Sequence, residues 1–423
     1  MKFNKTTLQN GLRVITVPMA DNPSVTVLVM VQAGSKYETK ENNGISHFLE
    51  HMVFKGTPSR PKASDISREL DSIGAHYNAF TSQEFTGYYA KADTRHADAI
   101  LDIVSDMYLH PVFDGADIEK EKGVIIEELR MYNDLPQRHV QDVLSELIHG
   151  DQPAGWEIIG TEETIRSFAR DNFVAYRNDH YVSAATTVIV AGSFDEKEMV
   201  GKIDKAFAGI SSTPNKGKLP ITESQDAPRL RVSFKETDQT HVAIGLRTFS
   251  LTDPRIPVTH VLSSVLGGGM SSRLFSKMRD QLGICYYIRA SHDAYTDHGD
   301  LNISAGVDSS RVQEGIMGIL GECERLKNEP VSDMELKKAK DYIAGTMMLE
   351  LETSDSRAEF AGYQEILKHE VSGPEEIIQK VNMVTAADVQ KLAQEVFVNA
   401  GLNMAVIGKF KDDSAFKEYF KFV

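Results

Sequence analysis

Two histidines four residues apart are the residues of this chain best suited to binding a metal ion. His47 and His51 enclose Phe48-Leu49-Glu50 in the pattern H-x-x-E-H, within a segment (44–55) that we predict to be a helix. Residues four apart share one helix face, so both imidazoles can reach a single tetrahedral ion, usually zinc. Glu50 precedes His51 by one residue and can take a proton from a water that zinc has acidified to a pKa of roughly 7. The pattern predicts metal-assisted hydrolysis, although three fixed residues also occur together by chance.

A hydrolytic zinc site needs a third protein ligand from a second rigid element. Segment 117–132 has apolar residues close to helical spacing, and its Glu121 and Glu128 are seven residues apart, two turns along one face. A carboxylate on an apolar face needs a partner, because an unpaired buried charge is costly. We therefore predict Glu128 as the third ligand and Glu121 as the group that orients a histidine ring. The face of the predicted helix that carries Glu121 and Glu128 also includes the apolar residues Val124, Ile125 and Tyr132. A solvated acidic helix is the alternative, and it suits Glu119 and Glu127.

These residues lie within longer motifs. Residues 47–57 (HFLEHMVFKGT) resemble the zinc motif of the pitrilysin-type metallopeptidases, a family that includes insulin-degrading enzymes and mitochondrial processing peptidases. Segments 78–89, 121–129, 267–275 and 279–286 resemble further motifs of that family, in the same order. The separation of His51 and Glu128 (128 − 51 = 77) also suits the family. The resemblance runs nearly end to end.

The resemblance implies one zinc ion per chain, held by His47, His51 and Glu128, with Glu50 as general base. It also implies that Asn78, Ala79, Phe80 and Thr81 form a substrate-binding edge strand, to which a peptide adds as a further strand. Asn78 is equally suited to an ordinary turn or edge position.

Two residues of the second half, Arg279 and Tyr286, are also expected to take part in catalysis. In the resembling family, an arginine and a tyrosine spaced like Arg279 and Tyr286 face the zinc from a C-terminal domain and polarise the scissile carbonyl. Both side chains donate hydrogen bonds, as the stabilisation of an oxyanion requires. A surface arginine and a packed strand tyrosine are the alternative.

The chain contains an internal repeat. Residues 67–77 (SRELDSIGAHY) and 276–286 (SKMRDQLGICY) align at an offset of 209. A similar offset of 212 places Thr259, Leu262 and Ser263 at the positions of His47, Glu50 and His51. The second half therefore repeats the pattern of the first without its predicted metal ligands.

We predict an α+β fold of two homologous domains, each a mostly antiparallel sheet with helices packed on one face. An early hairpin turn at 9–12 and long helical stretches over 114–149 and 333–368 fit this class. The predicted boundaries are a zinc-binding domain (1–211), a linker rich in turn formers (212–228) and a second domain without zinc ligands (229–423).

Composition excludes several classes of protein. A net charge of −15 over 423 residues argues against nucleic-acid binding, which needs clustered Lys and Arg. No run of about 18 apolar residues exists, so we predict no membrane span. The N-terminus lacks an apolar signal core, and the two cysteines, Cys285 and Cys323, form no disulfide framework. We expect a cytoplasmic protein, with a mature organellar protein as the alternative.

The combined prediction is a zinc-dependent endopeptidase that hydrolyses peptides or unfolded polypeptide segments in an enclosed chamber. Longer members of the resembling family contain four similar domains, so a chain with two is expected to form a homodimer. A heterodimer with a related chain is the alternative assembly. A non-catalytic structural or partner subunit of a processing-peptidase-like complex is the alternative function.

Overall fold

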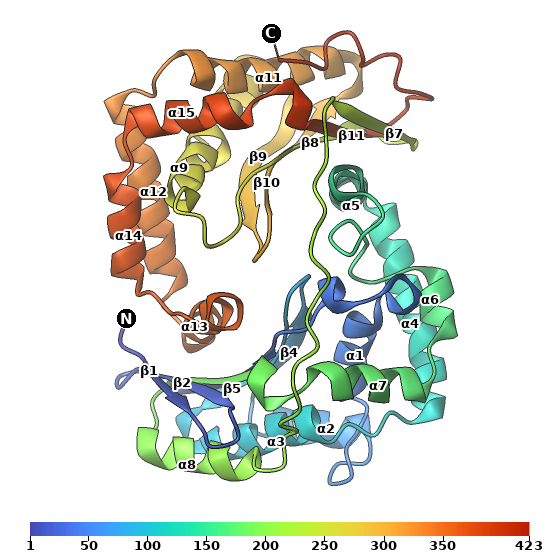
Figure 1. The fold of residues 1–423 in the computed structure, drawn as a ribbon, viewed down its shortest axis with the longest axis vertical. Coiled ribbons are helices and arrows are strands. Elements are labelled where there is room, and N and C mark those ends of the chain that lie inside the picture. The colour runs from blue at the N-terminus through green and yellow to red at the C-terminus, as the bar shows by residue number, and fades with distance from the viewer. Residues whose placement is uncertain (423) are drawn as a thin grey trace. The chain divides into compact units, whose positions relative to one another are not determined.

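A computed structural model describes residues 1–422 and divides them into two compact units (Figure 1). Unit 1 comprises Met1–Arg130, Glu157–Leu219 and Leu349–Gly373. Among the described residues, unit 2 comprises Met131–Trp156, Pro220–Met348 and 374–422. Both units are discontinuous, so a single cut within the predicted linker would not separate them.

Unit 1 is built on a six-stranded sheet with the order β1-β2-β6-β3-β5-β4. Only β2 and β6 are parallel among its neighbouring strands, as described in residues 1–422. The predicted turn at 9–12 joins β1 to β2, and Gly11 adopts the positive φ of 87° that this turn requires. The strands are β1 (Asn4–Thr7), β2 (Arg13–Pro18), β3 (Ser24–Val31), β4 (His76–Thr81), β5 (Thr86–Asp93) and β6 (Thr186–Gly192).

Helices cover both faces of this sheet. Its helices are α1 (Ile45–Val53), α2 (Ala63–Ser72), α3 (Ala97–Leu109), α4 (Gly115–Asp134), α6 (Glu162–Ser167), α7 (Arg170–His180), α8 (Glu196–Ala206) and α13 (Ser354–Lys368). On one face, Tyr108 of α3 packs on Tyr88 and bonds Thr186. On the other, α13 bonds Thr26 through Ser354. β3 is consequently buried on both faces, and its sequence SVTVLVMV is nearly continuous in apolar residues.

The sheet of unit 2 repeats the topology of the first sheet without a counterpart of β1. Its order is β7-β11-β8-β10-β9, with β7 and β11 as the parallel pair. The strands are β7 (Arg229–Phe234), β8 (Gln239–Arg247), β9 (Cys285–Ala294), β10 (Gly299–Asp308) and β11 (Leu402–Gly408). The matching order supports the internal repeat, because the same chain path produces both sheets.

The second sheet is also covered on two faces. Its helical segments are α5 (Pro136–His149), α9 (Ile256–Gly267), α10 (Arg273–Phe275), the π-helical turn η5 (Ser276–Gln281), α11 (Val312–Asn328), α12 (Asp333–Glu350), α14 (Pro374–Met383) and α15 (Ala386–Val396). Side chains of α9, α11 and α15 form a core with Val242 and Ile244 of β8. Leu144 and Ile148 of α5 pack on the opposite face, against Ala243.

One helix on each sheet therefore comes from a distant part of the chain. The pair α4–α5 recurs as α12–α13, and the second helix of each pair packs on the sheet formed mainly by the other half of the sequence (Figure 1). The two long helical stretches predicted over 114–149 and 333–368 are these pairs. The first stretch breaks at Pro136, which begins α5, because proline fits the first turn of a helix but not its interior.

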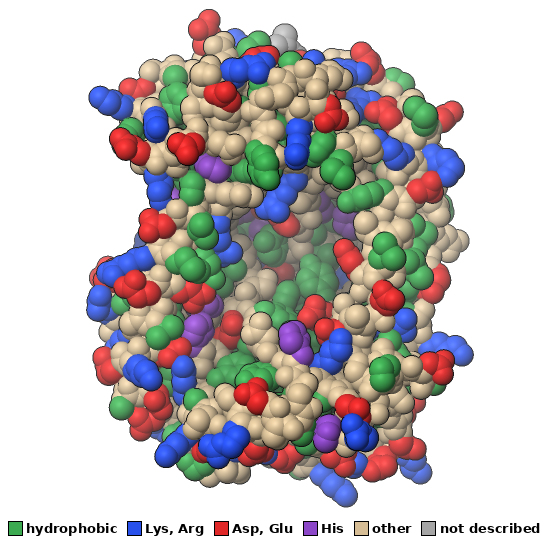
Figure 2. Space-filling view, turned by 180° about the vertical axis from the view of Figure 1, so that it is seen from behind, with side chains coloured by type: hydrophobic (Ala, Val, Ile, Leu, Met, Phe, Trp, Pro, Cys, Tyr) green, Lys and Arg blue, Asp and Glu red, His purple; other side chains and the backbone are tan. Residues whose placement is uncertain are grey.

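The predicted α+β class is confirmed, with two mostly antiparallel sheets. The expectation that helices pack on only one face of each sheet is wrong, because α13 and α5, each from a distant part of the chain, cover the second faces. Within residues 1–422, no helix is both long enough and apolar enough to cross a membrane. Acidic side chains alternate with Lys and Arg over the face shown in Figure 2.

Candidate metal centre

The helix that carries the H-x-x-E-H motif is anchored at its N-terminus by a buried glutamate. Glu38 Oε2 accepts a hydrogen bond from the backbone N–H of Gly44 at 2.8 Å, and Oε1 accepts one from the backbone N–H of Ser46 at 2.8 Å. These N–H groups have no partner within the helix, so the carboxylate satisfies them. Burial, opposed by these hydrogen bonds, raises the pKa of Glu38 to about 7. Gly44 has a φ of 96°, and a Cβ there would lie 2.5 Å from the carbonyl oxygen of Ile159.

The apolar side of α1 fixes the direction of its polar side. Phe48, Leu49 and Met52 are fully buried, and the Phe48 ring packs edge-on against Phe173 of α7 at a centroid distance of 4.9 Å. His47, Glu50 and His51 follow the spacing i, i+3, i+4 and therefore share the opposite face. The imidazole rings of the two histidines lie 4.8 Å apart, centroid to centroid.

The helix α4 places Glu128 next to both histidines. Glu128 Oε1 lies 3.8 Å from His47 Nε2, and Oε2 lies 3.5 Å from His51 Nε2. One potential ligand atom from each of the three residues falls within a group spanning no more than 4.8 Å. The structure thus brings together the three residues that we predict as ligands from the sequence.

Glu121 holds the other side of the His51 ring. Its Oε1 lies 2.9 Å from His51 Nδ1, and Oε2 forms an ion pair with Lys55. Burial opposes the charge on Glu121, but the hydrogen bonds from His51 and Lys55 outweigh it and lower its pKa. When Nδ1–H of His51 donates to Glu121, the lone pair of Nε2 faces Glu128. Such a carboxylate–histidine pair is typical of metal sites.

Two other carboxylates of α4 point into solvent. Glu119 pairs with Lys122, and Glu127 pairs with Arg130, at glutamate side-chain exposures of 70% and 72%. These are the two residues that suit a solvated acidic helix, so α4 has one solvated side and one side that meets the histidines.

The expectation that Val124 shares the buried face of α4 is wrong, because its side chain is 48% exposed. At about 100° of rotation per residue, Val124 lies roughly 60° round the helix from Glu121, at the border of the face. Ile125 lies nearer its centre and is buried, as expected. Tyr132 is half-buried.

The side chain of Glu50 extends from α1 to the edge strand β4. The hydroxyl of Thr81 donates a hydrogen bond to Glu50 Oε2. Burial raises the pKa of Glu50, and the hydrogen bond from Thr81 and the charge of His51 counteract that rise in part. A carboxylate with a raised pKa is a better proton acceptor, so Glu50 has the electrostatic setting of a general base.

The strand β4 forms one end of its sheet and pairs with β5. The residues nominated for substrate binding alternate along it: Asn78 is exposed, whereas Ala79 is buried. The Phe80 ring packs over Gly87, where a Cβ would come within 2.2 Å of the ring. The hydroxyl of Thr81 is bound to Glu50, and the role of the strand toward a substrate stays a prediction.

The donor set is suitable for zinc. Two imidazole nitrogens and one carboxylate oxygen are ligands that catalytic zinc sites combine with one open position. The three side chains are partly exposed, at 12%, 21% and 22%, so the open position can be reached by solvent or substrate.

Comparison with known proteins identifies the family of this chain. Residues 13–162 match the family described as Insulinase (Peptidase family M16), and residues 167–343 match the Peptidase M16 inactive domain. The chain belongs to peptidase family M16. It is 37% identical to the uncharacterized zinc protease YmxG of Bacillus subtilis, over 92% of this chain and 95% of that protein.

Other relatives resemble this M16 chain in sequence or in fold over nearly its whole length. An uncharacterized zinc protease of Streptomyces coelicolor is 30% identical over 97% of this chain and 90% of its own length. The crystal structure of a protease from Helicobacter pylori has the same fold, with a TM-score of 0.89 and 22% identity, covering 96% of this chain and 99% of that one. The helix α9 of the half matched to the inactive domain carries Thr259, Leu262 and Ser263 in place of ligands.

Arg279 and Tyr286 of this M16 chain lie together within unit 2. Arg279 Nη1 donates to the backbone carbonyl of Tyr286 at 3.0 Å, and its guanidinium carbon lies 5.4 Å from the Tyr286 ring centroid. The tyrosine is 71% exposed on the edge strand β9, whereas the neighbouring Tyr287 bonds His241. The role of the pair toward a zinc ion stays a prediction.

Sequence reasoning missed Glu38 as a support of the M16 zinc motif. Its nearest sequence signal is an acidic residue a few positions before the glycine that starts a helix. That signal is weak, because many loops contain one. Its connection to Ser46 depends on a loop conformation that periodicity does not reveal.

Proposed function

We propose that this chain is a zinc-dependent endopeptidase that hydrolyses peptides or unfolded polypeptide segments. The observation that carries the proposal is the placement of Glu50 on the same helix face as His47 and His51, opposite Glu128. Bound zinc would supply Lewis acidity, which polarises a scissile carbonyl and acidifies water.

Glu50 performs both proton transfers, and two neighbouring residues position the groups that take part. Glu50 accepts a proton from the attacking water and delivers it to the leaving amine, as a general base that then serves as general acid. Thr81 keeps one oxygen of Glu50 occupied, so that the other oxygen faces the reactants. Glu121 holds His51 in the orientation that a ligand needs.

The edge strand β4 supplies a mode of substrate binding. An extended peptide that pairs with β4 is held by backbone hydrogen bonds, which tolerate many side chains. Since Thr81 links β4 to Glu50, a peptide in register with residues 78–81 is brought to the catalytic base. This arrangement favours unfolded or flexible substrates, because a folded domain offers few free strands.

We further propose that Arg279 and Tyr286 of a second chain complete the site in an enclosed homodimer. The exposed hydroxyl and guanidinium are hydrogen-bond donors suited to the oxyanion that forms on the attacked carbonyl. Their contact with each other holds them as a unit before any substrate binds. A cyclic homodimer is the simplest assembly that gives both chains the same contacts.

Replacement of Glu50 by glutamine tests the proposal. Glu50→Gln should keep its zinc and lose about 10²- to 10⁴-fold or more in kcat on a fluorogenic peptide library, the usual range for general acid–base catalysis. Glu127→Gln is the matched control, because Glu127 is exposed on α4 and should change neither quantity. An inactive wild-type protein that binds zinc would instead favour the non-catalytic subunit.

A further inference from the structure

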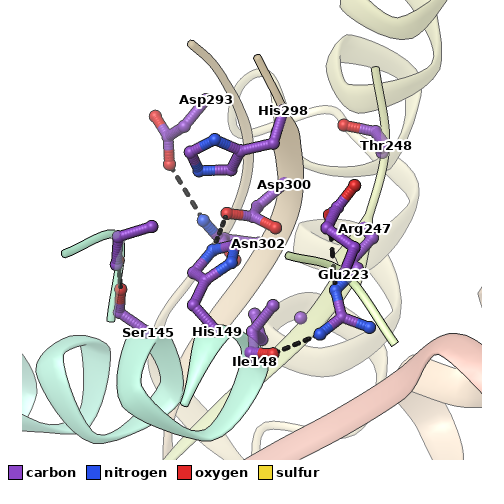
Figure 3. A network of polar contacts seen from close by, with 12 residues as sticks. Ser145, Ile148, His149, Glu223, Arg247, Thr248, Asp293, His298, Asp300 and Asn302 are labelled. Atoms are coloured by element: carbon purple, nitrogen blue, oxygen red, sulfur yellow. Dashed lines mark hydrogen bonds and ion pairs between the residues drawn. The ribbon is translucent and has the colours of Figure 1, made fainter. Parts of the chain in front are cut away.

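A second group of metal-ligand side chains lies inside unit 2. His149 ends α5, whereas His298 and Asp300 belong to the turn between β9 and β10 and to the start of β10. One potential ligand atom from each residue falls within a group spanning no more than 4.8 Å. Figure 3 shows His149 reaching from its helix toward Asp300, with His298 beside it. The segments that meet here are about 150 residues apart in the sequence (300 − 149 = 151).

All three side chains are buried, at exposures of 1% for His149, 0% for His298 and 8% for Asp300. His149 Nε2 lies 2.8 Å from Asp300 Oδ2. Within residues 1–422, the buried atoms Asp300 Oδ1 and His149 Nδ1 have no hydrogen-bond partner. Polar networks that serve packing alone are normally satisfied, because each unpaired buried atom costs about 1–3 kcal/mol.

Arg247 lies close enough to Asp300 for their charges to attract, but its hydrogen bonds go to other groups. Arg247 donates to the carbonyl oxygen of Ile148 and to Gln225, and it pairs with Glu223 at 3.4 Å (Figure 3). Arg247 therefore acts on Asp300 only at a distance, and no hydrogen bond joins the two side chains among those of the described residues. A buried carboxylate needs a bonded counter-charge, and a protonated histidine or a metal ion can provide it.

His298 is oriented in the manner of a metal ligand. Its Nδ1 lies 2.8 Å from Asp297 Oδ1, and the Tyr295 ring stacks on it at 4.5 Å with an interplanar angle of 14°. A neutral His298 that donates from Nδ1 has its lone pair on Nε2. The same carboxylate–histidine arrangement joins Glu121 to His51 in unit 1.

We propose that His149, His298 and Asp300 bind a second divalent transition-metal ion, with zinc favoured by the two imidazoles and one carboxylate. On binding, the ion takes the place of the hydrogen bond between His149 and Asp300, and their 2.8 Å contact widens to about 3.3 Å, as ligands about 2.0–2.1 Å from a tetrahedral ion require. Because the site is closed to solvent, we expect a structural ion, whose fourth position can be filled by the second oxygen of Asp300, Oδ1. The ion fastens the C-terminal end of α5 to the β9–β10 turn.

Metal counting in a variant without the first site tests this inference independently of peptidase activity. We expect purified wild-type protein, saturated with zinc and desalted, to retain two zinc ions per chain. His47→Ala/His51→Ala should retain one, and the addition of Asp300→Asn should remove it. Asp293→Asn is the matched control, because Asp293 lies near the end of β9 and accepts a hydrogen bond from Asn302. Asp297→Asn should weaken zinc binding in the second site about 10- to 100-fold.

Cobalt provides a second readout that does not require the Asp300 variant to fold. Titration of metal-free His47→Ala/His51→Ala with Co²⁺ should give one equivalent of visible d–d absorption, and Zn²⁺ should raise its melting temperature. One zinc per wild-type chain, together with no binding of either metal by folded His47→Ala/His51→Ala, would overturn the inference. The three residues would then form a proton-sharing network without a metal. The zinc count and the cobalt titration do not depend on whether Glu50→Gln loses peptidase activity.

Discussion

The hydroxyl of Thr81 donates a hydrogen bond to Glu50, and this contact joins the edge strand of the first sheet to the zinc-motif helix. One side chain thus belongs both to the strand proposed to bind substrate and to the surroundings of the general base. In the proposed mechanism, this oxygen–oxygen contact couples the register of the substrate to proton transfer.

Removal of that hydroxyl should slow the chemical step. Thr81→Val keeps the shape and β-propensity of the residue but leaves Glu50 without this donor, so kcat should fall about tenfold, a part of the 10²–10⁴ that general-base catalysis provides. Thr81→Ser should retain most of the activity. Steady-state kinetics with a quenched peptide, together with zinc analysis, makes the measurement. An unchanged kcat in Thr81→Val would show that the bond does not position Glu50.

Zinc affinity should rank the glutamates of α4. Glu128→Gln should weaken binding most, because it removes a charged ligand, and Glu121→Gln should weaken it about 10- to 100-fold. Glu127→Gln should leave affinity unchanged, since its carboxylate pairs with Arg130 in solvent. Competition with a chromophoric chelator measures all three. Equal affinities for the Glu127 and Glu128 variants would remove Glu128 from the ligand set.

Complementation should reveal whether two chains share a site. Glu50→Gln and Tyr286→Phe are each expected to be nearly inactive alone. In mixed dimers, the intact zinc site of the second variant and the intact Tyr286 of the first make one working site. Activity should therefore recover toward one quarter of the wild-type value after random exchange, as half of the dimers are mixed and each has one of its two sites. Mass spectrometry of differently tagged chains confirms the exchange. No recovery in exchanged dimers would contradict the shared site.

Glu38 should make stability depend on pH. Burial raises its pKa in the folded protein to about 7, whereas the unfolded value is about 4.3. Between these values the folded state binds more protons than the unfolded state, so the free energy of unfolding falls as pH rises. The contribution is fully present below pH of about 4.3 and is lost as pH rises through about 7, a change of about 3 to 4 kcal/mol.

Urea unfolding of the wild type and Glu38→Gln from pH 5 to pH 8 measures that contribution. The variant cannot titrate at this position, so the wild type should lose stability relative to it as pH rises. A constant difference across the series would show that Glu38 has an ordinary pKa in the folded protein.

Helix periodicity predicts a large part of the candidate site. His47, Glu50 and His51 share a face because of their spacing, and Glu121 and Glu128 share one for the same reason. Periodicity is less decisive at the border of a face, where apolarity alone does not tell whether a neighbouring segment covers the side chain. Val124 occupies such a border position on α4 and is half exposed.

Contacts between distant segments are not predictable in this way. The bond from Thr81 to Glu50 depends on how a strand lies beside a helix. The group of His149, His298 and Asp300 depends on a helix of the first half packing on the second sheet. His298 and Asp300 are two residues apart, as on one face of a strand, but His149 comes from a distant helix, so no local pattern identifies the whole group. Repetition of the sequence indicates two similar folds but not which helix covers which sheet.

The position of α13 has a consequence for synthesis of the chain. The last strand of the first sheet ends at Gly192, yet the helix that covers one of its faces ends at Lys368, which is 368 − 192 = 176 residues later. At roughly 5–20 residues per second, a ribosome needs roughly 9 to 35 s to add them. During that time the face that includes Leu28 and Met30 has no native cover, which makes the nascent chain a natural client for chaperones that bind apolar strands.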